Sequence, residues 1–268
     1  MSAITARIDV AKAEGRAVLV GYLPVGYPTV ETSLEAMRVL VEAGCDIVEV
    51  GPPYSDPLLD GPVIQHAAAT ALEHGVRVDD AFRAVNVVAE AGAVAVIMSY
   101  ANLMLSRGWE RFADDLVAAG GAGVITPDLT PDAAPEWIAA ARERDVDTIF
   151  LSAPSTTRER MKLTADASRG FVYATSLMGV TGERASVGDA AADVVRRTRE
   201  AGAERVCVGL GVSTGVQAAQ VAQYADGVIV GSAFVKALGD GETWRRCAPR
   251  SRNSPRASGV RRDPGLDP

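Results

Sequence analysis

Residues 46–62 read DIVEVGPPYSDPLLDGP, a short apolar strand pattern followed by a loop rich in proline and glycine. Glu49 stands in the middle of the apolar run, and Asp60 follows eleven residues later. An ionised carboxylate is costly to bury without a partner. A glutamate between Val48 and Val50 therefore indicates an ion pair, a solvent-facing strand end or acid–base chemistry. Two carboxylates in unlike surroundings can hold different pKa values and take different chemical roles.

The composition is that of a globular protein with enough apolar residues for a sizeable core. The chain has 268 residues, of which 48% are hydrophobic and 23% charged, and its net charge is −7. The negative charge argues against a nucleic-acid surface, which needs clustered lysine and arginine. The N-terminal segment lacks the apolar core of a signal peptide, no apolar run approaches ~18 residues, and the three cysteines lack metal-ligand spacing. We therefore expect a cytoplasmic protein without nucleic-acid or membrane partners.

Short apolar strands alternate with longer helical patterns along the chain. We predict eight strands, at residues 17–22, 46–50, 94–98, 123–125, 147–151, 170–174, 205–208 and 227–230. Helical patterns lie between them, at residues 30–42, 62–73, 109–119, 131–144, 190–200 and 214–224. Strict alternation indicates a parallel sheet, and eight units in about 240 residues favour a single-domain (β/α)8 TIM barrel. The open-sheet alternative would want a G-x-G-x-x-G turn after the first strand, where this chain has LPVGYP.

In such a barrel, chemistry collects where strands end and the following loops begin. Period-two alternation puts Ile47, Glu49 and Gly51 on one strand face, and Val48 and Val50 on the other. The valines suit the layer of helices, so Glu49 is expected to point into the barrel near its C-terminal mouth.

Residues 239–268 depart from this pattern, because they contain seven arginines, four prolines and only scattered apolar residues. We expect no stable packing from them and place the catalytic domain at residues 1–238. No final amphipathic helix is visible in this tail. A native disordered tail and a reading-frame slip near residues 243–246 both explain it, and the nucleotide sequence would decide between them.

Several motifs, in order along residues 15–238, together resemble the α subunit of tryptophan synthase. They are EVGPPYSDPLLDGPVIQ (49–65), MSYANLMLSRG (98–108), TPDL (126–129), GVTG (179–182), GLGVS (209–213) and GSAFVK (231–236). The resemblance implies a retro-aldol cleavage of indole-3-glycerol phosphate to indole and glyceraldehyde 3-phosphate. It implies neither metal nor organic cofactor, because the indole ring is its own electron sink.

The same resemblance implies the roles of individual residues. Glu49 would be the general acid–base, and Asp60 would stabilise positive charge at the indole N–H. The implied substrate-binding residues are Tyr22, Tyr100, Leu151, Tyr173, Thr181 and Leu210. The implied phosphate-binding residues follow strands and are Gly182, Gly211, Gly231 and Ser232. Each of these positions also suits an ordinary core or turn residue.

The resemblance also implies a partner, the pyridoxal-phosphate β subunit of an α2β2 complex. Residues 53–60 and 102–108 are candidate contacts, and residues 175–189 resemble the family's mobile lid. Packing within the barrel and a plain surface loop remain the alternatives for these segments. Three other functions stay open: a stand-alone indole-releasing lyase, a non-catalytic regulatory subunit, and another phosphate-binding barrel lyase or isomerase.

Overall fold

The structure is a computed structural model that describes residues 1–175, 187–209, 211–241 and 260–261. In this part of the chain nine strands pair in parallel, in the order β5-β4-β3-β2-β1-β9-β8-β7-β6. They are β1 (Arg16–Pro24), β2 (Ile47–Gly51), β3 (Val94–Met98), β4 (Gly123–Ile125), β5 (Asp147–Ile149), β6 (Leu151–Ser152), β7 (Val172–Thr175), β8 (Val206–Gly209) and β9 (Gly227–Val230). The two ends of this order, β5 and β6, are consecutive in the chain, so the sheet is a nearly closed barrel.

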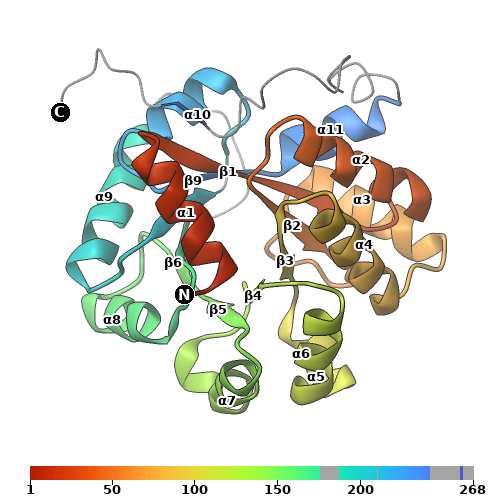
Figure 1. The fold of residues 1–268 in the computed structure, drawn as a ribbon, viewed down its shortest axis with the longest axis horizontal. Helices are drawn as coiled ribbons and strands as arrows, with labels where there is room; N and C mark the ends of the chain where they lie inside the picture. Colours follow the sequence, from red (N-terminus) through yellow and green to blue (C-terminus); the bar gives the residue numbers. More distant parts are fainter. Residues whose placement is uncertain (176–186, 210, 242–259, 262–268) are drawn as a thin grey trace.

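Helices surround this barrel on all sides (Figure 1). They are α1 (Ala3–Ala13), α2 (Val30–Glu42), α3 (Pro62–Glu73), α4 (Val78–Glu90), α5 (Ala101–Arg107), α6 (Trp109–Ala118), α7 (Pro135–Glu143), α8 (Arg158–Ala167), α9 (Val187–Glu200), α10 (Gly215–Val221) and α11 (Ser232–Gly239), with a 3-10 turn at Pro131–Ala133. The predicted ranges of α2 and α3 agree with the structure at both ends. Thr29 caps α2 by accepting a hydrogen bond from the Thr32 N–H, and Pro62 opens α3.

Alternate residues of each strand face two different apolar layers, as predicted. Ile47 belongs to the cluster inside the barrel, whereas Val48 and Val50 pack against the helix layer. Helix α1 lies in front of the strands in Figure 1, and its Ile4 and Ile8 belong to the inner cluster. The N-terminal end of the barrel is therefore closed by α1, which leaves the opposite end for a site.

The fifth predicted strand is divided into two pieces. β5 pairs with β4, β6 pairs with β7, and Phe150 between them packs into the helix layer. The Phe150 carbonyl still accepts a hydrogen bond from the Tyr173 N–H at 3.0 Å. The eight predicted strand positions are thus confirmed, and the ninth strand comes from this break.

Parts of the 239–268 segment lie against the barrel, since α11 extends to Gly239 and two later residues pair with a strand. Val260–Arg261 form β10, which pairs antiparallel with Arg16 and Ala17 at the start of β1. Val260 packs against the outer apolar layer there, a local exception to the expectation of no packing. None of the helices in the described ranges is long and apolar enough to cross a membrane.

Candidate active site

Glu49 is buried at the C-terminal mouth of the barrel. On β2 it is in register with Tyr22 of β1 and Val96 of β3, and it is 1% exposed. Among the described residues its Oε1 has no hydrogen-bond partner. Burial raises the pKa of Glu49 to about 8, because the charged form loses its hydration. The side chain is therefore a carboxylic acid at neutral pH.

Asp60 lies across the mouth, at the end of the β2–α3 loop. A tight turn orients it, in which the Asp60 N–H donates to the Pro57 carbonyl at 3.1 Å. The Tyr100 hydroxyl donates to Asp60 Oδ2 at 3.4 Å. Burial raises the pKa of Asp60 to about 6, and the bond from Tyr100 opposes that rise. At pH 7 Asp60 is therefore mostly ionised while Glu49 is protonated, which is the division of states that acid–base chemistry needs.

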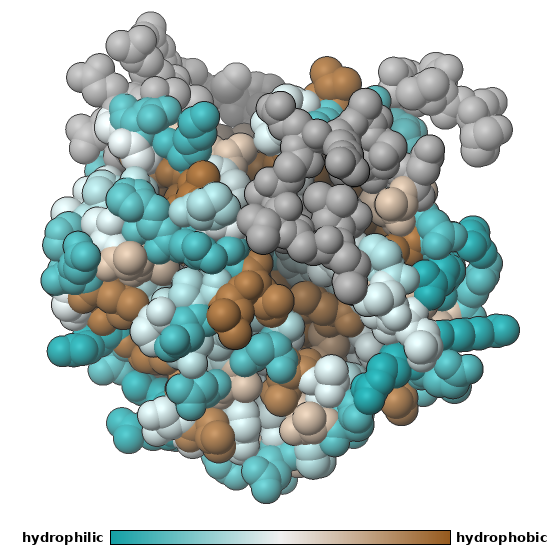
Figure 2. Space-filling view, turned by 180° about the vertical axis from the view of Figure 1, so that it is seen from behind, coloured by the Kyte–Doolittle hydropathy of each residue, from teal (hydrophilic) through white to brown (hydrophobic). Residues whose placement is uncertain are grey.

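Figure 2 shows the mouth of the barrel, on the side opposite to α1. A hollow lies near the centre of this view, with apolar side chains beside it. Aromatic rings, prolines and one carboxylate line the cleft: Tyr22, Pro52, Pro53, Tyr54, Asp60, Ala68, Met98, Tyr100 and Pro127. The cleft is nearly closed in this structure, with a volume of about 10 Å³. Its lining of aromatic rings and prolines beside a carboxylate has the chemistry that a planar heteroaromatic ring with an N–H needs.

Two strand-end glycines allow tyrosine rings to lie across the mouth. A Cβ on Gly51 would lie 2.5 Å from the Tyr22 hydroxyl, and one on Gly209 would lie 1.9 Å from the Tyr173 hydroxyl. Burial raises the pKa of both phenols, and the charges of Glu49 and Asp60 raise them further. The two rings thus stand beside both carboxylates. Gly51 could be placed on the inward strand face from the sequence, whereas Gly209 stood only within a larger motif; a glycine that ends a barrel strand was a usable signal for both contacts.

The structure brings together five of the predicted site residues at the mouth: Tyr22, Glu49, Asp60, Tyr100 and Tyr173. Leu151 joins them, because it is in register with Tyr173 and packs on the inner cluster. Thr181, Gly182 and Leu210 lie outside the described residues. So does most of the predicted lid, residues 176–186, although α9 already begins at Val187 rather than at the predicted residue 190.

The predicted phosphate-binding residues that are described follow β8 and β9. Gly211 has φ +89°, a left-handed conformation that favours glycine. Gly231 is the N-cap of α11, and Ser232 is its first residue. A Cβ on Gly231 would be 3.4 Å from the Tyr22 ring, so the positive end of α11 lies at the same mouth. Backbone amides at such a helix start attract anions.

Two polar residues that support the site were missed. The Asp128 carboxylate accepts a bifurcated hydrogen bond from the Ala101 N–H, with its two oxygens at 3.0 and 3.2 Å, and so caps α5 behind Tyr100. The Tyr54 ring stacks on Tyr100. Both residues stand in quoted motifs, but nothing in the sequence shows which side chains meet.

Features away from the mouth carry none of the predicted site residues. An open groove lies between α8 and α9, lined by Arg158, Met161, Arg196, Arg197 and Glu200. Within the described ranges no group of three or more histidine, cysteine, aspartate or glutamate side chains is arranged to hold a metal ion.

Comparison with known proteins agrees with the motifs at this mouth. The sequence model of the family described as tryptophan synthase alpha chain matches residues 8–256. This chain belongs to that family. It is 56% identical over 254 residues to the tryptophan synthase alpha chain of Mycobacterium marinum, covering 92% of this chain and 94% of that protein. It is 55% identical over 259 residues to that of Mycobacteroides abscessus, covering 97% of each.

Solved structures show the same fold. Tryptophan synthase of Mycobacterium tuberculosis superposes with a TM-score of 0.87 at 53% identity, covering 92% of this chain and 95% of that chain. A chain of the α2β2 tryptophan synthase complex of Pyrococcus furiosus superposes with a TM-score of 0.80 at 34% identity. The match covers 87% of this chain and 94% of that chain. The predicted family and the predicted TIM barrel are both confirmed.

Proposed function

We propose that this chain cleaves indole-3-glycerol phosphate to indole and glyceraldehyde 3-phosphate by a retro-aldol reaction, as an α subunit of tryptophan synthase. The observation that carries the proposal is Glu49, a buried carboxylic acid whose Oε1 has no hydrogen-bond partner among the described residues. It lies beside the same tyrosine rings as Asp60, a carboxylate of lower pKa. A general acid at this place must hold its proton at neutral pH, and the raised pKa of Glu49 supports that role.

Glu49 serves both proton transfers of the proposed reaction. It first gives its proton to C3 of the indole ring, which leaves positive charge on the ring nitrogen. The Glu49 carboxylate then takes the proton of the hydroxyl on the neighbouring side-chain carbon. As that oxygen forms the aldehyde, the C–C bond breaks and its electron pair restores the neutral aromatic ring. Glu49 ends protonated, so the cycle consumes no other reactant.

Asp60 stabilises the charge that develops on the indole. Its carboxylate accepts a hydrogen bond from the ring N–H, which becomes more acidic when C3 is protonated. The bond strengthens in the transition state, so it lowers the barrier rather than only improving binding. The Tyr100 hydroxyl orients the carboxylate for this contact.

The remaining predicted residues bind the two ends of the substrate. The indole ring lies among apolar and aromatic side chains, for which we propose Tyr22, Tyr100, Leu151, Tyr173, Thr181 and Leu210. The phosphate lies at the loops after the last strands and at the start of α11, for which we propose Gly182, Gly211, Gly231 and Ser232. We place this catalytic domain at residues 1–238 and propose that residues 175–189 form its lid.

A β subunit is the proposed partner, in an α2β2 complex like the one named for Pyrococcus furiosus. Exposed leucines support this, because Leu58 is 88%, Leu59 is 54% and Leu105 is 57% exposed near the mouth. Apolar side chains gathered in this way favour an interface. We propose that residues 53–60 and 102–108 contact the partner, and that the complex is cytoplasmic.

The test is indole release from indole-3-glycerol phosphate by the purified chain, with and without its cognate β subunit. We expect slow release alone, release at least about tenfold faster with the partner, and loss of release in Glu49→Gln. Rapid release that the partner does not change would favour the stand-alone lyase. No release in either condition would refute the proposal and favour a non-catalytic subunit.

A further inference from the structure

Tyr54 has no role in the proposed reaction, yet it packs against the residue that holds Asp60. Its ring stacks on that of Tyr100, with centroids 4.8 Å apart and an angle of 26° between the planes. Its hydroxyl accepts a hydrogen bond from Asn102 Nδ2 of α5 at 3.4 Å. Tyr54 therefore connects the β2–α3 loop to the start of α5.

Tyr100 in turn contacts the end of the β2–α3 loop twice through one oxygen. Its hydroxyl accepts a hydrogen bond from the Leu59 N–H at 3.2 Å and donates one to Asp60 Oδ2 at 3.4 Å. The backbone after Tyr100 is fixed, because the Ala101 N–H donates to the Asp128 carboxylate. The Tyr100 side chain could still rotate on this fixed backbone, and the stacked ring of Tyr54 restricts that rotation.

We propose that Tyr54 is a positioning residue for Asp60. Its ring holds Tyr100 in the orientation in which one hydroxyl reaches both the Leu59 amide and the Asp60 carboxylate. The inference rests on the proposed function, in which that carboxylate meets the indole N–H. A displacement of about 1 Å at a reacting group can cost up to 100-fold in rate, so a residue two contacts away can matter.

Loss of the Tyr54 ring has a consequence that a general loss of packing lacks. Among the described residues, Tyr100 supplies the one side-chain hydrogen bond to the Asp60 carboxylate, and that bond lowers its pKa against the effect of burial. Without it the pKa of Asp60 rises above about 6. Among the described residues, the charge of Asp60 also acts on the phenols of Tyr22 and Tyr173, which Glu49 affects as well. Tyr54 makes no described ring contact or hydrogen bond with any of these three residues.

The test compares Tyr54→Leu with Tyr54→Phe in the full chain bound to its β subunit. We expect Tyr54→Leu to lower kcat about tenfold, with a smaller rise in KM because Tyr54 is also one of the residues that line the cleft. The acid limb of the pH profile of kcat/KM should move upward by about half a pH unit or more, as the carboxylate loses its bond. Tyr54→Phe keeps the ring and should keep the acid limb.

The matched control is Tyr27→Leu, which removes another partly buried ring, one that contacts His66 rather than Tyr100. It should leave the acid limb in place. The proposal is overturned if Tyr54→Leu keeps the wild-type kcat and acid limb, if it raises only KM, or if both leucine variants lower kcat equally with no shift of the limb.

A second measurement separates this proposal from the reaction itself. The pKa of Asp60 can be followed by carbon-13 NMR in aspartate-labelled chains, with Asp60→Asn to assign the signal. A higher pKa in Tyr54→Leu than in wild type is expected. If wild type releases no indole, the proposed function fails, and an unchanged pKa in this titration would overturn the positioning role independently.

Discussion

The two ends of the barrel both bury carboxylates, but in the part of the chain that the structure describes only those at the N-terminal end pair with cations. There Asp46 pairs with Arg16 at 2.8 Å, Asp226 with Arg199 at 2.8 Å, and Asp147 with Arg169 at 3.4 Å. At the C-terminal end, Glu49 is just as buried and has no ion pair among the described residues. Burial of an acidic side chain is therefore common to both ends.

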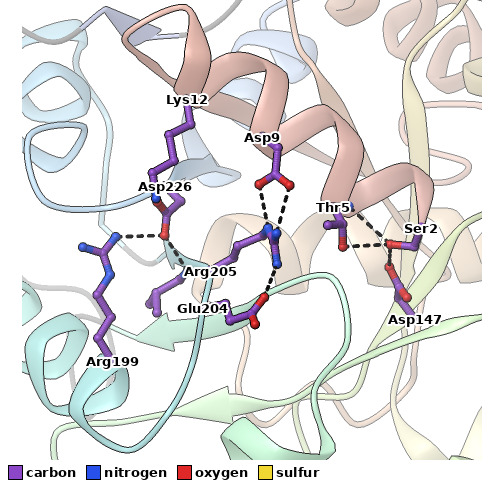
Figure 3. A network of polar contacts seen from close by, with 10 residues as sticks. Ser2, Thr5, Asp9, Lys12, Asp147, Arg199, Glu204, Arg205 and Asp226 are labelled. Atoms are coloured by element: carbon purple, nitrogen blue, oxygen red, sulfur yellow. Dashed lines mark hydrogen bonds and ion pairs between the residues drawn. The ribbon is translucent and has the colours of Figure 1, made fainter.

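Polar contacts at the N-terminal end also fasten α1 to the strands (Figure 3). Arg205 holds Asp9 through two bonds of 2.8 and 2.9 Å, and the Ser2 hydroxyl donates to Asp147. Asp226 accepts from the Val206 N–H at 2.9 Å as well as from Arg199. Each of these buried aspartates therefore has hydrogen-bonding or ionic partners in neighbouring parts of the fold.

The difference between the ends distinguishes structural from functional carboxylates. The partners of a buried carboxylate, a cation or an N–H, compensate for its lost hydration, so that removal of one partner destabilises the fold. A buried carboxylic acid without a cation costs stability, and such a cost is typical of active sites. A substitution at one end at a time separates the two kinds of carboxylate.

The largest effect is expected for Glu49→Gln, which removes the proposed acid–base group. Indole release should fall at least about 1000-fold, within the range of general acid–base catalysis. Steady-state release with the β subunit bound checks this. A loss below about tenfold would show that Glu49 is not the proton donor.

The same variant should gain stability above neutral pH. Because the pKa of Glu49 is raised to about 8, the folded chain keeps a proton that the unfolded chain loses above about pH 4.5, so stability falls as pH rises through this window. Glutamine has no such dependence. Urea unfolding should give Glu49→Gln about 4 kcal/mol more stability than wild type at pH 8, and little difference at pH 4. Equal stability at pH 8 would contradict the raised pKa.

At the other end, Asp46→Asn should affect stability rather than catalysis. It leaves the buried Arg16 guanidinium without its main partner, which costs about 3 kcal/mol of unfolding free energy. The activity of the folded fraction should stay at the wild-type value. Glu14→Gln, which changes the half-exposed second partner of Arg16, is the control and should cost less than about 1 kcal/mol.

Asp60→Asn should reduce activity by about 50-fold, since an amide oxygen stabilises the indole N–H charge less well than a carboxylate. Wild-type kcat/KM should fall as pH drops through about 6, where Asp60 takes up a proton. The variant should lack this acid limb. An unchanged limb in Asp60→Asn would assign it to another group.

The smallest effect is expected for Asp9→Asn, which breaks a solvent-exposed contact of α1. The Asp9 side chain is 40% exposed, so its pair with Arg205 is screened by solvent. Thermal unfolding should show a loss of at most about 1 kcal/mol, and the loss should shrink in high salt. A loss as large as that of Asp46→Asn would mean that exposure does not separate the two pairs.

The inward direction of Glu49 could be predicted because one rule, the alternation of side chains along a strand, decides it. The starts of α2 and α3 were also predictable, since Thr29 and Pro62 are local signals. Helix α1 carried a signal that was not used, in the spacing of Ile4, Ile8 and Ala11 along one helix face.

Other features depend on contacts between distant parts of the chain. The strand breaks at Phe150 because β5 pairs with β4 whereas β6 pairs with β7. Local sequence does not specify with which strand a segment pairs. The stack of Tyr54 on Tyr100 joins two loops that are far apart in the sequence. The pairing of Val260 with Ala17 arises in an arginine-rich and proline-rich stretch without periodicity.

The most direct test of the contrast between the two ends is the protonation state of Glu49 in the folded chain. Difference infrared spectra between wild type and Glu49→Gln isolate the signal of this one carboxyl group. The structure predicts a carboxylic-acid carbonyl band at pH 7 that disappears as the pH rises through about 8. A carboxylate band already present at pH 5.5, with no acid band at pH 7, would contradict the account.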